Sequence, residues 1–181
     1  MTDATGAGGP SRIDRVLDPS FVERLEDLSL EEIRRRRDEA LAEREFQSYL
    51  RRLVQVRQDL LRAEQERRAA GEEPKPIMDR LASVLSGGPK GAGRGEALRL
   101  NLNPSDVAEA ERRADEVLGG FPLASPEEVD EERLGGAVRV LDHLEREVSD
   151  IRAAVIRVHD LLQEELKRRY REDPSLIAQG R

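Results

Sequence analysis

Two stretches of this chain place apolar residues at the spacing of an α-helix, and both are unusually long. Over residues 29–70, leucine, isoleucine and valine keep one helical face, and no glycine or proline interrupts them. Residues 126–171 show the same periodicity. At a rise of about 1.5 Å per residue, each helix would be roughly 60–70 Å long, a length typical of coiled coils.

Residues that commonly begin and end helices mark the limits of both stretches. Ser29 with Glu32 forms a capping-box sequence at the start of the first helix, and Gly71 follows its end. Ser125, followed by a proline and two glutamates, predicts that the second helix begins there. A glycine pair at 135–136 weakens its first turns, because each glycine costs on the order of 1 kcal/mol relative to alanine.

The remaining segments are shorter or poor in apolar residues. Residues 1–11 are rich in glycine and predict a disordered tail, and residues 172–181 form a C-terminal tail. Residues 71–125 connect the two long helices. They contain a short helical pattern at 77–85, a glycine-rich stretch, and a second helix predicted from Pro104 onward.

These elements predict an all-α fold. Two long helices in one chain most simply pack in opposite directions, so we expect a long antiparallel two-helix coiled-coil hairpin. It would form a single helical domain over residues 12–171, and the apolar spacing of residues 21–28 adds a short N-terminal arm. Composition agrees: charged residues make up 38% and aromatic residues 3%, which suits helices that each bury a single stripe.

One stripe of the first long helix is polar where a coiled-coil seam is normally apolar. Ser48, Arg51, Gln55 and Asp59 are spaced three, four and four residues apart, so they share one helix face. A seam that buries these polar groups must supply partners for them. Single polar positions can set the register of a coiled coil, whereas a whole stripe also suits a bound ligand.

Part of this stripe recurs on the second long helix. Ser149, Arg152 and Asp160 repeat the hydroxyl, the guanidinium and the carboxylate at the same offsets. In an antiparallel hairpin we expect Ser48 near the level of Asp160, and Asp59 near that of Ser149, so that the two stripes face one another. Register-setting positions in a charge-rich coiled coil and a shared ligand site are the two interpretations of this repeat.

A guanine nucleotide would use all of these groups. Its O6 and N7 atoms accept two hydrogen bonds from one arginine. Its N1–H and N2–H groups donate to a carboxylate in the same planar manner, and a serine hydroxyl can reach a phosphate. Two facing stripes would suit a ligand, or a pair of ligands, with symmetric guanines and phosphates.

The sequence lacks the signals of an enzyme, a metal site or a membrane protein. It contains no cysteine, and its two histidines, His143 and His159, are too far apart to bind one metal ion. No phosphate-binding loop, nucleophile elbow or dinucleotide fingerprint occurs, so we predict no catalytic residue. The net charge of -7 argues against direct nucleic-acid binding. No apolar run approaches the roughly 18 residues of a membrane span, which predicts a cytoplasmic protein.

Three stretches resemble the RsiG family of actinobacterial anti-sigma factors. They are RIDRVLDPSFVERL near the N-terminus, RRRRDEA with SYLRRLVQVRQDLLRAE in the first long helix, and EREVSDIRAAVIRVHDLLQEELKRRYR in the second. The family motif is Glu, three residues, Ser, two, Arg, three, Gln, three, Asp, once on each helix of an antiparallel pair. The resemblance implies that these motifs bind cyclic di-GMP and that the loaded protein sequesters a sigma factor of the flagellar and sporulation type.

The resemblance assigns ligand-binding residues to both motif copies, each with one departure. Arg44 stands at the Glu position of the first copy and adds a positive charge that favours a phosphate. Ile156 stands at the Gln position of the second copy, and the lost hydrogen bond would lower affinity by about 1–2 kcal/mol. The matching residues are Ser48, Arg51, Gln55 and Asp59 in the first copy and Glu145, Ser149, Arg152 and Asp160 in the second.

The resemblance therefore implies an anti-sigma factor that represses transcription, with cyclic di-GMP as its regulatory ligand. Two other classes of protein stay open. The two motif departures favour a sigma-binding coiled coil that works without ligand. A structural, self-associating helical scaffold would instead form a homodimer and have no sigma partner. Two motif copies in one chain imply that one chain can form the site alone, so a homodimer is not required.

Overall fold

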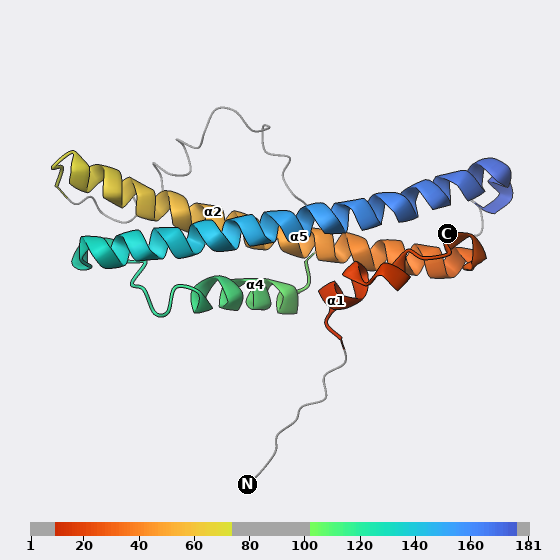
Figure 1. Cartoon of the computed structure of the whole chain (residues 1–181), viewed down its shortest axis with the longest axis horizontal. Helices are drawn as coiled ribbons and strands as arrows, with labels where there is room; N and C mark the ends of the chain where they lie inside the picture. The colour runs from red at the N-terminus through yellow and green to blue at the C-terminus, as the bar shows by residue number, and fades with distance from the viewer. Residues whose placement is uncertain (1–9, 74–101, 177–181) are drawn as a thin grey trace, which may run out of the picture. The chain divides into compact units, whose positions relative to one another are not determined.

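The computed structural model of the chain describes residues 10–73 and 102–176, and every element within them is helical. The all-α prediction is thereby confirmed. The helix expected at 77–85, the glycine-rich stretch after it and the outer parts of both predicted tails lie outside the described residues. Figure 1 shows the elements in order: α1 (Arg12–Leu17), η1 (Pro19–Phe21), η2 (Leu25–Asp27), α2 (Leu30–Ala69), α4 (Pro104–Glu116), η3 (Pro126–Glu128) and α5 (Glu131–Glu172).

Both ends of α2 lie where the sequence predicts them. At the start, the Ser29 hydroxyl accepts a hydrogen bond of 3.1 Å from the backbone N–H of Glu32, which satisfies one of the unpaired donors of a helix N-terminus. At the end, Gly71 has a φ of 67°. Its N–H donates to the Arg68 carbonyl, and the next N–H donates to the Arg67 carbonyl, so α2 ends in a Schellman motif.

The start of α5 differs from the prediction. Ser125 makes no side-chain cap, and the three residues after it form only the 3-10 turn η3. The chain then becomes extended at Val129, whose side chain is buried in a hydrophobic core. Asp130 caps the helix instead, because its carboxylate accepts a 2.7 Å hydrogen bond from the backbone N–H of Arg133. The helix therefore begins at Glu131, and the glycine pair at 135–136 lies inside it.

The shorter helices also begin at local caps. The Asn103 side chain accepts a 2.8 Å hydrogen bond from the N–H of Asp106, and Pro104 occupies the first helical position; this confirms the predicted helix start. In α1, Ser11 and Asp14 form a capping box in which each side chain bonds the other's backbone. That box explains why residues 12–17 form a helix.

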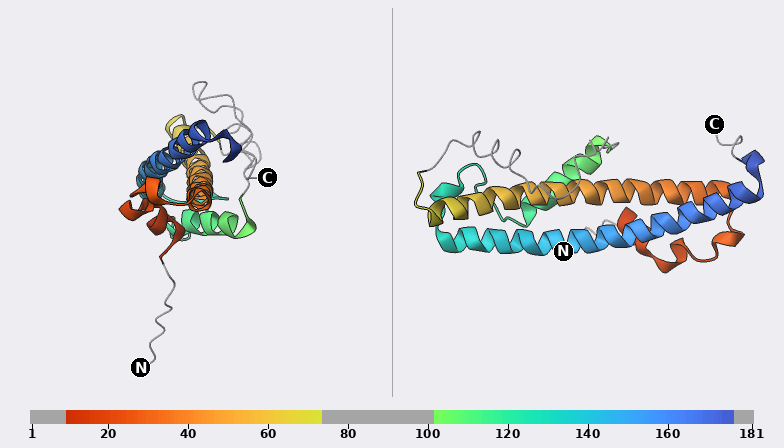
Figure 2. Two further views of the ribbon diagram at one scale, coloured as in Figure 1. Left: turned by 90° about the vertical axis from the view of Figure 1, so that its right-hand side faces the viewer. Right: turned by 90° about the horizontal axis from the view of Figure 1, so that it is seen from above.

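The described residues divide into two compact units: unit 1, residues 10–45 with 151–176, and unit 2, residues 46–73 with 102–150. In unit 1, the start of α2 packs against the end of α5, and α1 with the two 3-10 turns lies along them (Figure 2). Its buried core contains Val16, Phe21, Ile33, Ala40, Val155, Leu162 and Leu166.

In unit 2, the end of α2 packs against the start of α5, and α4 covers them. Arg51 contacts Ser149, whereas Arg68 contacts Glu131. Partners therefore move backward along α5 as α2 advances, which confirms the antiparallel arrangement in this unit. The buried core includes Leu50, Val54 and Leu61 of α2, Ala110 and Ala114 of α4, and Leu134, Leu141, Leu144 and Val148 of α5.

A buried carboxylate holds the C-terminal end of α2. Glu64, 1% exposed, accepts hydrogen bonds of 2.7 and 2.9 Å from Arg67 and of 2.8 Å from Arg68. Arg68 also donates to the backbone carbonyls of Pro126 and Val129, at 2.8 and 2.9 Å. The hydrogen bonds from Arg67 and Arg68 outweigh burial and lower the pKa of Glu64 to about 2. This arrangement, the unit 2 clamp, ties the end of α2 to the segment that begins α5.

The C-terminal end of α5 is held in the same way. Glu165 accepts hydrogen bonds of 2.7 and 2.8 Å from Arg168 and of 2.7 Å from Arg169. Arg169 also donates to the carbonyls of Leu25 and Leu28, at 2.7 and 2.8 Å. The hydrogen bonds from both arginines outweigh burial and lower the pKa of Glu165 to about 2. This unit 1 clamp ties the end of α5 to the turn that begins α2.

The two clamps belong to an internal repeat. Each clamp residue of unit 2 has its counterpart 101 positions later or earlier, and so do Ser48 and Ser149 of the polar stripes. The first residues of α2 and α5, Leu30 and Glu131, have the same offset. The α1 sequence RIDRVL recurs 101 positions later as RADEVL. The repeat therefore extends well beyond the polar stripes, over helix starts, turns and helix ends.

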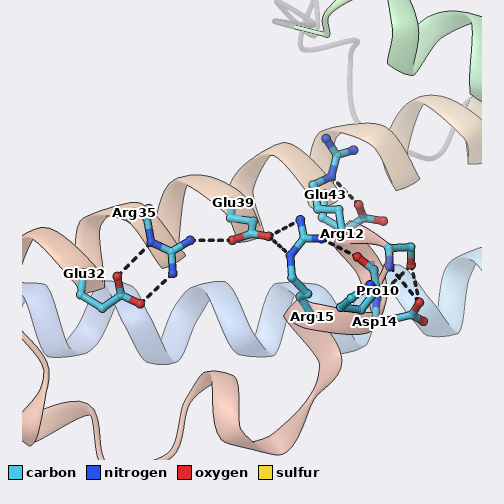
Figure 3. Close-up of polar contacts among 9 residues, drawn as sticks. Pro10, Arg12, Asp14, Arg15, Glu32, Arg35, Glu39 and Glu43 are labelled. Carbon is cyan, nitrogen blue, oxygen red and sulfur yellow. Dashed lines mark hydrogen bonds and ion pairs between the residues drawn. The ribbon is translucent and has the colours of Figure 1, made fainter. Parts of the chain in front are cut away.

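Unit 1 carries an additional network of charges on its surface (Figure 3). Glu39 of α2 accepts from Arg15 of α1 at 2.8 Å and from Arg35 at 3.2 Å. Arg35 continues to Glu32 at 2.7 and 2.9 Å. Arg12 of α1 pairs with Glu43, which is 3% exposed, at 2.7 Å. This ion-pair ladder fastens α1 to the first half of α2.

Candidate functional site

The polar stripe of α2 lies at the border between the unit 2 core and solvent. Leu50 and Val54, on the adjoining face, are fully buried and fix the rotation of the helix about its axis. This rotation leaves the four predicted residues half-buried, neither enclosed in the core nor fully solvated: Ser48, Arg51, Gln55 and Asp59.

Four predicted ligand-binding residues meet in unit 2, two from each motif copy. The Nε atom of Arg51 donates to Glu145 Oε1 at 2.8 Å and to Ser149 Oγ at 2.9 Å. Gln55 Nε2 donates to the same Glu145 oxygen at 3.3 Å, and Ser149 Oγ does so at 3.1 Å. We call Arg51, Gln55, Glu145 and Ser149 the Arg51 cluster.

The Arg51 cluster holds Glu145 in its ionised form. Burial acts to raise the pKa of this carboxyl, but hydrogen bonds from Arg51, Ser149 and Gln55, with the charge of Arg51, lower the pKa below its usual value. The guanidinium of Arg51 is thus balanced by one negative charge from the other helix. An arginine on this border keeps its charge and its remaining donors for a further acceptor.

The register of the helices differs from the one expected. Ser149 lies against Arg51, not against Asp59, which is eight residues further along α2. At about 1.5 Å per residue, the difference is roughly 12 Å, or two helical turns. Both registers bring polar residues of the stripes together, so polarity alone did not select between them.

The other two predicted residues of α2 flank the Arg51 cluster. Asp59 is half-buried, and its carboxylate makes no hydrogen bond or ion pair with any residue in the described part of unit 2. Such a carboxylate on a partly buried face can accept from a ligand. Ser48 lies one turn before Arg51 on the same face.

The remaining predicted residues belong to unit 1. Arg152 is half-buried on α5, and Asp160 is exposed there, with its carboxylate 3.3 Å from His159 Nδ1. Arg44 is half-buried on α2. Ile156, at the Gln position of the second motif copy, is also half-buried and offers no hydrogen-bonding group to a ligand.

Over residues 10–73 and 102–176, no cluster of three or more histidine, cysteine, aspartate or glutamate side chains could hold a metal ion. No helix in that part of the chain is both long and apolar enough to cross a membrane.

Comparison with known proteins supports the family resemblance. Residues 19–85 match the sequence model of a family described as RsiG-like, which confirms the suspected RsiG relationship. The matched span includes the first polar stripe and the whole of α2. No curated protein matches the chain. The RsiG-like match suggests an anti-sigma role, with a sigma factor as partner, and hence a regulatory rather than an enzymatic protein.

Proposed function

We propose that this chain, given its RsiG-like match, is an anti-sigma factor that binds cyclic di-GMP at the Arg51 cluster and the neighbouring motif residues. The loaded protein would hold a sigma factor of the flagellar and sporulation type away from RNA polymerase and so repress its promoters. The observation that carries the proposal is the meeting of residues from both motif copies around Arg51.

The free groups near Arg51 suit guanine. The terminal nitrogens of Arg51, Nη1 and Nη2, donate to no residue in the described part of the chain, whereas its Nε donates to Glu145 and Ser149. Two parallel donors match the O6 and N7 acceptors of guanine. The unpaired carboxylate of Asp59, two turns along α2, offers the acceptor that guanine N1–H and N2–H require. Adenine presents an amino donor in place of O6, so it would be rejected.

The sigma-binding step would follow from what the ligand does to the long helices. A dinucleotide that bonds residues of α2 and α5 within unit 2 would hold the two helices of that unit at one spacing. A fixed spacing lowers the ordering cost of a helical surface when it binds a partner. Ligand binding and sigma binding would therefore strengthen each other, as thermodynamic linkage requires.

Isothermal titration calorimetry of the full chain with cyclic di-GMP tests the ligand. We expect Arg51→Ala to weaken binding about 100-fold, because it removes a bidentate, charge-assisted contact. Arg52→Ala is the matched control, since Arg52 is the next residue of α2 and is exposed; its affinity should stay within about twofold of the wild type. Equal affinities for the two variants, or equal binding of cyclic di-AMP, would contradict the proposed site.

A pull-down of the sigma factor, with and without cyclic di-GMP, separates this function from a second candidate. A constitutive sigma-binding coiled coil has one specific observation in its favour: Glu145 already supplies Arg51 with a counter-charge in the absence of ligand. That candidate predicts equal capture of sigma under both conditions. A self-associating scaffold predicts no capture and a dimer by mass. Capture that depends on the nucleotide supports the anti-sigma switch.

A further inference from the structure

We infer that Glu145 and Ser149 position Arg51 for the nucleotide. This inference rests on the proposed function and gives two predicted ligand residues a different task. Sequence alone treats all members of a motif as equivalent ligand contacts. The geometry of the Arg51 cluster separates them into one residue that would bind the base, Arg51, and residues that hold the Arg51 side chain in place.

The bonding of the Arg51 guanidinium carries the inference. Glu145 and Ser149 both accept a hydrogen bond from the Nε–H of Arg51, at 2.8 and 2.9 Å. Because the guanidinium is planar, fixing its Nε end also fixes the direction of its two terminal nitrogens. These terminal nitrogens donate to no residue of the described chain, so the end that matches guanine O6 and N7 stays open.

The acceptor side of the cluster is consistent with this division. One oxygen of Glu145, Oε1, receives Arg51, Gln55 and Ser149, at 2.8, 3.3 and 3.1 Å. This oxygen is therefore fully used in holding the side chains of the cluster in place. The side chain of Glu145 is 20% exposed and that of Arg51 is 38% exposed, so the arginine is the more accessible member of the pair.

The internal repeat shows that the second motif copy has the anchoring glutamate and the first does not. The counterpart of Glu145, 101 positions earlier, is Arg44, and the counterpart of Gln55 is Ile156. The first motif copy therefore has no carboxylate at the position from which the second copy anchors Arg51.

A double-mutant cycle with cyclic di-GMP and cyclic di-AMP tests the inference by calorimetry on the full chain. Glu145→Gln should weaken cyclic di-GMP binding about 10-fold and reduce its preference over cyclic di-AMP by a similar factor, since an unanchored Arg51 aims poorly. Ser149→Ala should act in the same direction by about threefold. The combination of Glu145→Gln with Arg51→Ala should bind no more weakly than Arg51→Ala alone, because a positioning residue has nothing left to position.

Asp150→Asn is the matched control, because Asp150 neighbours Ser149 on α5 and is exposed; its affinity and base preference should match the wild type. Thermal unfolding of each variant verifies that the helices remain folded. Additive losses in the double variant, or an unchanged base preference in Glu145→Gln, would show that Glu145 does not act through Arg51 and would overturn this inference alone. Absence of wild-type binding would overturn the proposed function together with it.

Discussion

The C-terminal ends of α2 and α5 are built alike, whereas the positions around the two motif copies have diverged. Glu64 with Arg68, and Glu165 with Arg169, make the same bonds to the turn that precedes the other long helix. Yet Glu145, which anchors Arg51, has Arg44 as its counterpart in the repeat. The clamp is therefore present in both copies of the repeat, whereas the glutamate that anchors the motif arginine is present in one copy.

The difference separates the requirements of the scaffold from those of the site. Each clamp satisfies the carbonyls of a 3-10 turn and the charge of a carboxylate, so either copy would lose stability if its clamp changed. The proposed ligand site, assembled from two copies, would need only one contribution to each function. The departures at Arg44 and Ile156 would then be tolerated, because Glu145 of the second copy and Gln55 of the first copy are still present.

The largest effect should come from breaking a clamp. Arg68→Ala removes two bonds to backbone carbonyls and one to the buried Glu64, and we expect a loss of about 2–4 kcal/mol in the free energy of unfolding. Arg169→Ala should cost a similar amount in unit 1. Urea unfolding followed by circular dichroism measures both.

Lys167→Ala is the matched control for the clamp variants. Lys167 pairs with Glu164 on the exposed surface of α5, and such pairs contribute less than about 1 kcal/mol. A clamp variant as stable as this control would mean that the carbonyls of the 3-10 turn find other donors. The two helix ends would then share a sequence pattern that does not contribute to the free energy of unfolding.

The next effect depends on pH. The pKa of Glu64 is lowered to about 2, below an unfolded value of about 4.3. Its contribution to stability is therefore complete above the unfolded pKa and disappears as the pH falls through the folded pKa. Glu64→Gln should cost about 2–3 kcal/mol at pH 7, and the difference from the wild type should vanish near pH 2.

Urea unfolding at pH 7, 4 and 2 measures this dependence, with Glu66→Gln as control on the exposed side of the same turn. The control should follow the wild type at every pH. Glu165→Gln should reproduce the result in unit 1, because the pKa of Glu165 is also lowered to about 2. A difference that stays constant between pH 7 and pH 2 would assign the loss to packing instead of charge.

The features that the sequence predicted well are those with local causes. Ser29, Asn103 and Gly71 act through bonds to residues within a few positions, so the helix limits they set could be read directly. The start of α5 was predicted five residues too early, at Pro126, because Pro126 satisfies the rules for a first helical residue. Burial of Val129, a tertiary effect, extends the chain there and delays the helix.

Four of the eight motif residues named from the sequence lie together in the Arg51 cluster, but their register was not predicted. Motif spacing selected the members of the Arg51 cluster, but side-chain polarity could not fix the register, since a shift of two turns again pairs polar faces. The clamps escaped prediction because Glu and Arg three or four residues apart are ordinary on exposed helices. Only their carbonyl acceptors, far away in sequence at Leu25 and Pro126, identify them as clamps.

The smallest effect should come from the ion-pair ladder, which sharpens the comparison because unit 2 does not repeat it at the corresponding positions. The counterparts of Glu39 and Arg35 are Val140 and Gly136. Glu39→Gln should destabilise the attachment of α1 by about 0.5–1 kcal/mol, since ion pairs with solvent-exposed arginines contribute little individually, and salt should reduce this difference. Hydrogen exchange should accelerate about two- to fivefold in α1 and stay unchanged in α4.

Glu31→Gln, on the exposed first turn of α2, should leave exchange in α1 unaltered. Faster exchange in α4 would show that the ladder stabilises the whole molecule and not unit 1 alone.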